Sequence, residues 1–404
     1  MTPRRPLART AVWTALAVAL LLAPAAAGPP PARVVAVGDV HGAYERVTAL
    51  LQRVGLIDAR HQWAGGGATF VQTGDVVDRG AGTRECLDLL MALQRQAPRT
   101  GGKVITLVGN HEVMNVIGDL RYVTPAIFAT FATPASEKTR ERAYKDYLKF
   151  LAAHDGHGHG AVPPADDAAR QAWMDEHPPG FFEHREAFGP GGKYGKWIRS
   201  HHAVVQIGDG LFVHGGLNPA LEFASIRQLD DRVMADVRAF DATWRALADA
   251  GVIWRHMTFA EAVRFAEEEA AWYVAANKAG EIKAGPEIVR LLDYKNWITV
   301  SADGPLWYRG LATEPEATLS GPLTAMLERL RARYIVAGHS VLVSKEVTTR
   351  FEGRVFLIDT GMLEESYAGR ASALEVQGGR FTALTSDAEP RTLPAPSKSP
   401  APVR

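Results

Sequence analysis

Two residues near the start of the chain have the types and the spacing of a metal-binding pair. Asp39 and His41 lie in the segment GDVHG, which follows a run of β-branched residues at 34–37. Residues i and i+2 of an extended chain project to the same side, so this carboxylate and imidazole can hold one cation. Gly38 and Gly42 leave the backbone bare where another group must approach closely. Because a D-x-H tripeptide also fits an ordinary surface turn, its meaning depends on whether similar residues recur later in the chain.

Similar polar residues do recur at the ends of later apolar runs. Residues 68–72 lead into GDVVDRG, residues 103–108 lead into GNHE, and two further runs end in HGG and GH. Together they provide a mixed oxygen and nitrogen set with no cysteine: Asp39, His41, Asp75, Asn110, His214 and His339. This set suits first-row transition metals such as manganese, iron or zinc, and suits calcium poorly. Six ligands exceed the needs of one four-coordinate ion, but they are enough for two ions that share a bridging carboxylate.

A pair of metal ions predicts chemistry at phosphorus. Two ions about 3.5–4 Å apart stabilise the attacking and leaving oxygens of an in-line displacement and turn a bridging water into hydroxide. His111 comes directly after Asn110, so its side chain should point elsewhere and stay free to protonate the leaving oxygen. Asp78 could orient that imidazole. Arg79 and Arg309 offer planar guanidinium groups to the non-bridging phosphate oxygens.

The elements that position these residues alternate between strands and helices. Apolar residues recur at helical spacing after His41 and again from Cys86 to Leu93, between the three predicted strands. This βαβαβ order predicts a parallel sheet, in which ligands bind at the carboxyl ends of the strands. Cys86, the sole cysteine, is interpreted as a small core residue, and it cannot form an intramolecular disulfide.

The second half of the chain adds strands, hairpins and two insertions. Strands are predicted at 202–207, 211–213 and 333–337, a helix at 323–331, and hairpins at 345–359 and 372–383. Residues 117–200 and 220–300 have mainly helical patterns, and we interpret them as insertions. The histidine-rich segment HDGHGHG at 154–160 could be an accessory metal site, but its glycines favour a flexible polar loop. The acidic run at 261–273 is interpreted as a solvated helix face.

The first residues resemble a targeting segment. Arg4 and Arg5 precede an apolar stretch at 11–22, and small residues come next at 25–27. This order predicts a signal peptide over residues 1–27 and export to the periplasm or beyond the cell. The alternative is an uncleaved membrane anchor, although the apolar stretch is short for a membrane span.

The composition of the chain indicates its general type, its partners and the limits of its folded domain. The chain has 404 residues, of which 47% are hydrophobic, as in a globular protein with a full core. Acidic and basic residues balance at 45 each, so no general field attracts nucleic acid, and no membrane contact is expected after signal cleavage. Proline, serine and alanine dominate after residue 386, which predicts a catalytic domain at 28–386 and a disordered tail at 387–404.

The five motifs GDVHG, GDVVDRG, GNHE, HGG and GH, in this order over residues 34–339, resemble those of calcineurin-like metallophosphoesterases. The resemblance is closer to their PPP phosphoprotein phosphatases and closest to bacterial Shewanella-like protein phosphatases. It implies an α/β fold, the αββα sandwich of two mixed sheets flanked by helices, with a mainly helical insertion. Val341 stands where broader relatives have a further histidine, which agrees with the PPP branch.

The resemblance also implies roles for the candidate residues. One metal ion is expected on Asp39, His41 and Asp75, and the other on Asp75, Asn110, His214 and His339. His111 and Asp78 are the expected acid pair. The expected phosphate contacts are Arg79, Arg309 and Asn110, and Arg309 lies in a GP-x-W-Y-R-G pattern similar to that of the Shewanella-like branch.

Three functions remain open from the sequence. The first is a dinuclear phosphomonoesterase that uses a metal-bound hydroxide on phosphoproteins carrying phosphoserine, phosphothreonine or phosphotyrosine. The second is a phosphoesterase acting on small molecules or nucleotides, including dinucleoside polyphosphates. The third is a metal-binding scaffold without activity. The presence of Asp78, Arg79 and His111 disfavours the scaffold, which has no need of an acid pair.

Overall fold

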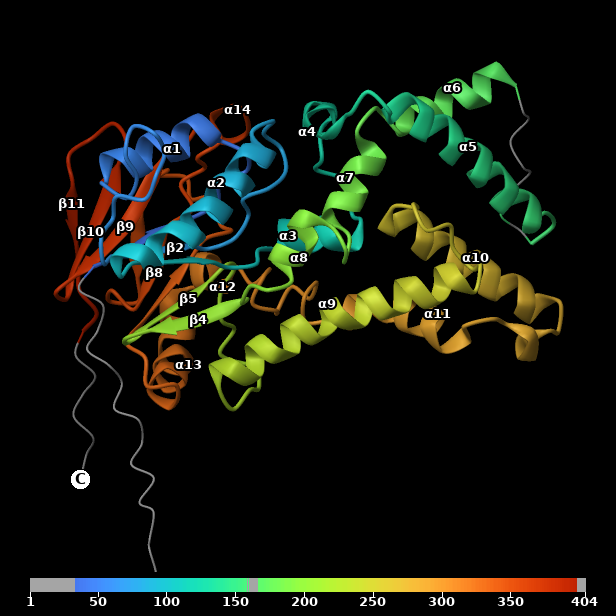
Figure 1. Cartoon of the computed structure of the whole chain (residues 1–404). Coiled ribbons are helices and arrows are strands. Elements are labelled where there is room, and N and C mark those ends of the chain that lie inside the picture. The colour runs from blue at the N-terminus through green and yellow to red at the C-terminus, as the bar shows by residue number, and fades with distance from the viewer. Residues whose placement is uncertain (1–32, 158, 160–165, 398–404) are drawn as a thin grey trace, which may run out of the picture. The chain divides into compact units, whose positions relative to one another are not determined.

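The computed structural model describes residues 33–157, 159 and 166–397 (Figure 1). The predicted signal peptide at 1–27 lies outside these residues and stays a prediction. Within the described part of the chain, no helix combines the length and the apolar character needed to cross a bilayer.

The first sheet contains the predicted parallel βαβαβ unit. Its parallel strands are β1 (Val34–Val37), β2 (Thr69–Gln72) and β3 (Lys103–Thr106), joined by helices α1 (Tyr44–Arg53) and α2 (Thr83–Gln96). Antiparallel strands β9 (Ser372–Gln377), β10 (Arg380–Thr385) and β11 (Arg391–Leu393) extend it beyond β1, in the order β11-β10-β9-β1-β2-β3. Gly378 and Gly379, both at positive φ, form the predicted turn between β9 and β10.

The second sheet has the order β4-β5-β6-β8-β7 and mixes parallel and antiparallel pairs. Its strands are β4 (Val204–Ile207), β5 (Gly210–Val213), β6 (Tyr334–Ala337), β7 (Thr348–Arg350) and β8 (Val355–Leu357). Strands β5, β6 and β8 run parallel to one another, so their carboxyl ends lie at one edge of the sheet.

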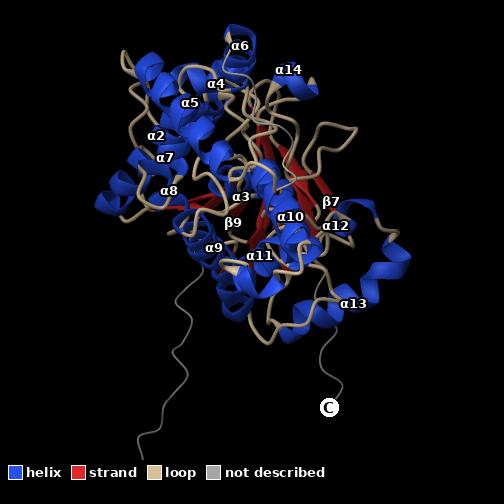
Figure 2. Cartoon of the chain, turned by 90° about the vertical axis from the view of Figure 1, so that its right-hand side faces the viewer, coloured by secondary structure: helices blue, strands red, loops and turns tan. Residues whose placement is uncertain are grey.

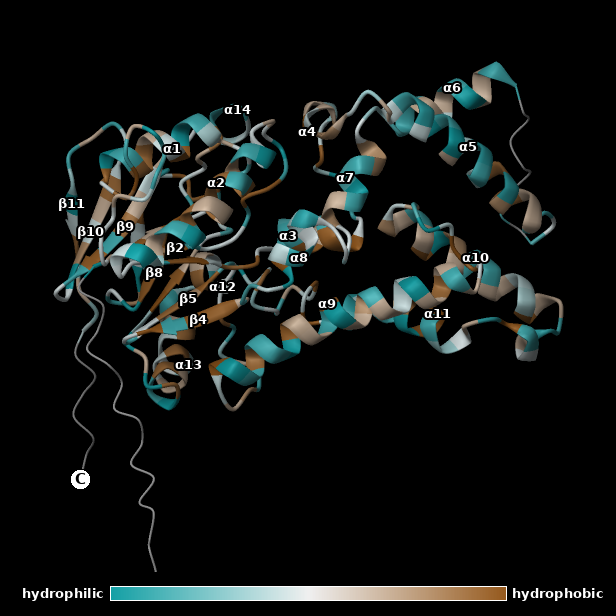
Figure 3. Ribbon diagram, in the orientation of Figure 1, coloured by the Kyte–Doolittle hydropathy of each residue, from teal (hydrophilic) through white to brown (hydrophobic). Residues whose placement is uncertain are grey.

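Alternating side chains on the strands hold the two sheets and their helices together. Val34 and Ala36 face the core between the sheets, whereas Val35 and Val37 pack with residues of α1 and α2. Hydrophobic residues accordingly concentrate on the strands, and the helices carry more hydrophilic residues (Figure 3). On the other side, helix α13 (Glu316–Arg329) buries residues such as Leu323 against the second sheet. This helix–sheet–sheet–helix arrangement is the predicted αββα sandwich.

The insertions are helical, as predicted. In Figure 1 most of their helices project from one side of the sheets, and Figure 2, viewed from that side, shows them in front of the strands. The helices that come after β3 are α3 (Asn110–Ile117), α4 (Pro125–Phe131), α5 (Ser136–Ala153), α6 (Asp167–Glu176), α7 (Phe181–Phe188) and α8 (Lys193–Ile198). Those that come after β5 are α9 (Ile226–Asp249), α10 (Phe259–Ala275), α11 (Gly285–Leu292) and α12 (Gly310–Thr313). Short helix α14 (Glu364–Tyr367) precedes β9, and 3₁₀ turns occupy Ala97–Thr100, Ala279–Glu281 and Asp293–Asn296.

Two expectations about secondary structure are wrong. Helix α13 begins at Glu316 rather than at 323, with Pro322 inside it. The tail expected at 387–404 contains strand β11, in which Leu393 pairs with Phe381 and is only 4% exposed. Burial of that side chain between the sheets outweighs the turn-forming composition around it. Residues 398–404 lie outside the described part of the chain.

Candidate active site

The strand-end residues predicted from the sequence meet at one place. Asp39 comes after β1, Asp75 after β2, His214 after β5 and His339 after β6, while Asn110 begins α3 just beyond β3. The six candidate ligands are all at most 6% exposed. The facing carboxyl ends of two parallel strand sets bring them together, as expected for ligand sites in such sheets.

Unusual backbone geometry marks the same loops. His41, Asp75 and His339 have φ angles of 47°, 58° and 65°, in the left-handed region that residues other than glycine rarely adopt. Such conformations cost about 1–3 kcal/mol each and collect at functional sites. Glu112 holds one of these loops, because its carboxylate accepts hydrogen bonds of 2.8 Å from the backbone N–H groups of Asp75, Val76 and Gly109.

One group of ligand atoms surrounds His214. Its Nε2 lies 2.8 Å from Asn110 Oδ1, 3.1 Å from His339 Nδ1 and 3.3 Å from Asp75 Oδ2. Its Nδ1 lies 3.1 Å from the carbonyl oxygen of Thr73, which directs Nε2 toward the other three. These four side chains are the predicted ligands of the second metal ion, and their donor atoms fit one transition metal.

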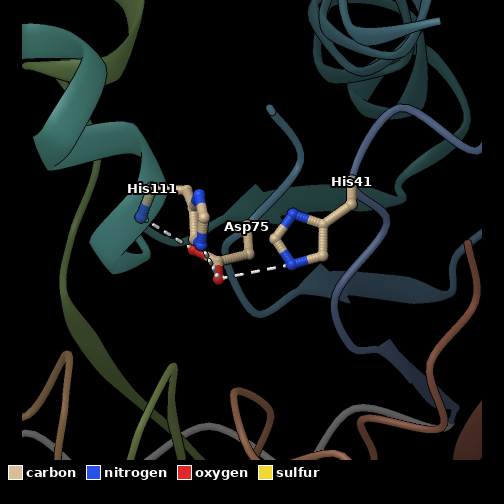
Figure 4. A group of neighbouring side chains, drawn as sticks. All are labelled: His41, Asp75 and His111. Carbon is tan, nitrogen blue, oxygen red and sulfur yellow. Dashed lines mark hydrogen bonds and ion pairs between the residues drawn. The ribbon is translucent and has the colours of Figure 1, made fainter. Parts of the chain in front are cut away.

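A second group of ligand atoms also includes the carboxylate of Asp75. His41 Nε2 lies 3.7 Å from Asp75 Oδ2 and 3.9 Å from Asp39 Oδ2, and its Nδ1 contacts the carbonyl oxygen of Val77 at 2.9 Å. Figure 4 shows His41 and His111 reaching Asp75 from different sides. Asp75 thus joins both groups, as a bridging carboxylate must.

The charges in the site favour bound cations. Burial raises the pKa of Asp39 well above its usual value, helped by the nearby Asp359 and Asp75 carboxylates. Burial lowers the pKa of His41 to about 3 and that of His339 to about 2, so these imidazoles are neutral and available as ligands. Within the described chain, His339 Nε2 is buried without a hydrogen-bond partner. Buried carboxylates beside neutral imidazoles lack positive charge, which metal ions would supply.

His111 is placed to act as an acid. Its Nδ1 lies 2.6 Å from Asp78 Oδ2, and the other oxygen of Asp78 accepts a hydrogen bond from Asn115 at 2.7 Å. Although burial lowers the pKa of His111, the nearby Asp75 and Asp78 carboxylates outweigh it and raise the pKa above its usual value. The imidazole therefore carries its proton to higher pH than a free histidine, with Nε2 turned toward the ligand groups.

The two predicted phosphate-binding arginines contact different residues of this centre. Arg79 Nη1 is 2.7 Å from His41 Nε2 and 3.2 Å from His111 Nε2, so it must give up the first contact when His41 holds a metal ion. Arg309 is exposed and donates a hydrogen bond of 2.8 Å to the carbonyl oxygen of His339. In the described chain Arg309 forms no ion pair with Asp303, whose carboxylate accepts a hydrogen bond from Asn218 instead. The guanidinium of Arg309 therefore contacts a backbone carbonyl oxygen rather than that carboxylate.

Several residues at the site were missed by the sequence analysis. Asp359 is 1% exposed and lies close enough to Asp39 for its charge to affect that carboxyl, and burial raises the pKa of Asp359 to about 6. It comes just after strand β8, so the strand-end pattern could have revealed it had β8 not been interpreted only as a hairpin arm. Tyr122 and Tyr367 flank the Arg79 guanidinium, with ring centres 4.7 and 5.3 Å from its Cζ. No sequence signal marks these two rings.

The fold and this constellation define a metal-dependent phosphoesterase, and comparison with known proteins identifies the family. The profile of the family described as calcineurin-like phosphoesterase matches residues 32–342. The chain belongs to that family, which confirms the predicted fold and the predicted enzyme class. The two carboxylate–histidine groups, His41–Asp75–His111 and Asp75–His214–His339, support the expected dinuclear metal centre.

Individual relatives point to one branch of the family. Shewanella-like protein phosphatase 2 of Arabidopsis thaliana is 36% identical over 188 residues, which are 46% of this chain and about half, 47%, of the plant protein. Shewanella-like protein phosphatase 1 of Plasmodium berghei is 22% identical over 82% of this chain and 67% of its own length. Both support the predicted resemblance to Shewanella-like phosphatases.

A solved structure supports the fold. The crystal structure of a cold-active protein-tyrosine phosphatase from a psychrophilic Shewanella species superposes with a TM-score of 0.55 at 24% identity. The superposition covers 89% of this chain and 80% of that protein. The similarity of fold therefore extends over most of the chain.

Proposed function

We propose that this protein is a dinuclear-metal phosphomonoesterase that removes phosphate from phosphoproteins carrying phosphoserine, phosphothreonine or phosphotyrosine. The observation that carries the proposal is the sharing of Asp75 between two ligand groups, directly beside the His111–Asp78 pair. A scaffold would need the ligands alone. The protein phosphatases among the relatives favour a phosphoprotein over a nucleotide as substrate.

Each side chain of the site has its own role in the proposed reaction. Metal ions held by the six expected ligands would supply positive charge to the phosphate oxygens and lower the pKa of the attacking water. Arg79 and Arg309 bind non-bridging oxygens and orient the ester for in-line attack, with the amide of Asn110 as a further contact. His111 donates the proton on Nε2 to the leaving oxygen, while Asp78 holds Nδ1 and stabilises the charged imidazole before the transfer.

The metal identity and the location of the protein are further parts of the proposal. The mixed carboxylate, amide and imidazole set suits manganese, iron or zinc. The order of basic, apolar and small residues at 4–27 supports export, with the mature chain acting in the periplasm or outside the cell.

A substrate panel tests the proposed function. Phosphoserine, phosphothreonine and phosphotyrosine peptides are compared with mononucleotides and dinucleoside polyphosphates at equal concentration, and kcat/KM is measured for each. We expect at least one phosphopeptide class to exceed every nucleotide, and Asp75→Asn to abolish both activities. Preference for nucleotides would overturn the substrate assignment, and equal activity of wild type and Asp75→Asn would overturn the site assignment.

A further inference from the structure

A cavity of about 780 Å³ lies among the helices of the two insertions, on residues that the candidate active site does not use. Helices α5, α7 and α9 line it together with the segment 251–256 that follows α9, and Figure 1 shows these helices on the same side of the sheets. Its volume falls within the range of about 300–1,000 Å³ that is usual for pockets that bind small molecules. The cavity is therefore large enough for a small organic ligand.

Aromatic side chains form much of the cavity wall. Phe182, Phe240 and Trp254 are each at most 8% exposed, and Phe150 and Trp244 are partly buried. Ligand pockets are commonly lined by hydrophobic and aromatic side chains, with a few polar groups that fix the orientation of the ligand. Because aromatic rings pack well against other rings, this wall favours a ligand with a planar, apolar body.

Arg185 places a charged group in this cavity. Among the described residues its guanidinium forms no hydrogen bond and no ion pair, and its Nε is buried without an acceptor. The guanidinium packs against Gly118, where a Cβ atom would lie 2.5 Å from Nη1, and its Cζ lies 5.8 Å from the centre of the Trp244 ring. A buried charge is costly unless an opposite charge or hydrogen-bonding groups face it.

The surroundings leave the charge of Arg185 unbalanced. Burial lowers the pKa of Arg185 to about 10, and the nearby Glu261 carboxylate offsets this effect only in part. Asp241 also lines the cavity, but its carboxylate is held by Arg199 through two hydrogen bonds of 2.7 Å. His256, another lining residue, is neutral, because burial and the nearby Arg185 charge lower its pKa to about 4. An anion bound beside Arg185 would supply the missing negative charge.

The rim of the cavity bears no net charge. Its exposed charged residues are three arginines and three acids: Arg142, Arg245, Arg255, Asp146, Glu186 and Asp249. Because these charges balance and a single guanidinium lies inside, the cavity suits a ligand with one negative charge better than a ligand with two. A guanidinium and a carboxylate can pair through two parallel hydrogen bonds, so a carboxylate has the fitting charge and geometry.

We propose that this cavity binds a small aromatic carboxylic acid, whose carboxylate pairs with Arg185 and whose ring lies against Trp244 and Trp254. The cavity is separate from the dinuclear centre. Helix α3 begins with Asn110 in the candidate active site, and Val116 near its other end lines the cavity. The two sites therefore lie at opposite ends of α3.

Calorimetric titration of the full chain with 2-naphthoate tests this site. The metal-loaded protein is titrated in an excess of inorganic phosphate, so that phosphate rather than naphthoate occupies the dinuclear centre. We expect saturable binding of one naphthoate per chain to wild type, and binding about 10- to 100-fold weaker to Arg185→Gln. Arg238→Gln is the matched control, because Arg238 is an exposed residue of α9 that does not line the cavity, and it should bind naphthoate like wild type.

The neutral analogue 2-naphthamide separates the pairing of charges from a change in the shape of the cavity. Naphthamide should bind wild type about 10- to 100-fold more weakly than naphthoate, and Arg185→Gln should bind the two compounds equally. If Arg185→Gln does not fold, Ala248→Trp fills the cavity from α9 instead; it should bind neither compound and keep the nitrophenyl phosphate turnover of wild type. Equal binding of the two compounds by wild type, no saturable binding by wild type, or full naphthoate binding by either site variant would overturn the proposal.

Discussion

Replacing His111 by asparagine tests whether the site hydrolyses phosphate esters with His111 as its general acid. The substitution removes the imidazole, whose Nδ1 contacts Asp78 at 2.6 Å and whose Nε2 lies 3.8 Å from Asp75 Oδ2. The side chain of His111 is buried, and asparagine is smaller, so the protein can accommodate the change. His111 is not among the six expected ligands. The metal content should therefore remain that of wild type.

The size of the loss of turnover depends on how much the leaving oxygen needs a proton. General acid catalysis contributes about 10²–10⁴-fold, which corresponds to about 2.7–5.4 kcal/mol of activation free energy. We expect His111→Asn to lose turnover on this scale with peptide or alkyl phosphates, whose leaving oxygens need a proton. The loss should shrink with nitrophenyl phosphate, because its leaving group is stable as an anion. Asp78→Asn should give a milder loss of the same pattern.

The pH dependence has a defined sign. Because the folded protein raises the pKa of His111, the acid is protonated below that raised pKa and lost as the pH increases through it. Turnover of peptide phosphates should therefore fall on the basic side of the profile. Asp78→Asn removes a carboxylate that raises the pKa of His111, so the basic limb should move to lower pH.

The assay combines steady-state kinetics on both substrates with metal analysis for wild type, His111→Asn and Asp78→Asn. A loss of metal in His111→Asn would show that this residue is a ligand and that its assignment as the acid is wrong. Full turnover of a peptide phosphate with intact metal content would place the acid elsewhere.

Four further predictions concern the bridging ligand, a phosphate contact, a buried loop anchor and the N-terminus. Asp75→Asn should lose more metal, measured by elemental analysis, than any other single ligand substitution, because Asp75 serves both ligand groups; retention of both ions would contradict the bridge. Arg309→Ala should raise KM and lower kcat in phosphopeptide kinetics, and Arg309→Lys should not restore them, because a point charge cannot replace the planar fork; wild-type kinetics would exclude phosphate binding. Glu112→Ala should lower the free energy of unfolding in urea by about 3–5 kcal/mol, because three backbone N–H groups lose their acceptor; a change under about 1 kcal/mol would mean that water replaces the carboxylate. N-terminal sequencing of protein from its native host should find a chain that begins after Ala27, and a chain that begins at Met1 would refute cleavage.

Much of the site can be predicted from short sequence motifs. Each motif combines an apolar run, a glycine and a ligand-capable residue, and parallel strands necessarily bring such ends to one edge. That rule is why Asp39, Asp75 and Asn110 could be placed together from the sequence, and likewise His214 and His339. The two sets belong to different sheets, and only the family resemblance implied that they meet. The same rule, applied to the strand at 355–357, would have found Asp359. The position of His111 directly after Asn110 predicted a role other than metal binding, and the family motifs then supported His111 and Asp78 as the acid pair.

Tertiary structure alone decided the features that depend on distant partners. Nothing local to HDGHGHG shows that His157 and His159 stack on one helix and face Glu269, since those contacts bridge more than 100 residues. Local composition likewise predicted a loose tail, whereas burial of Leu393 between two sheets creates strand β11. Sequence pattern determines which face of an element is apolar. The packing of elements far apart in the chain decides which polar groups are buried and therefore which of them need a charge, a proton or a metal ion.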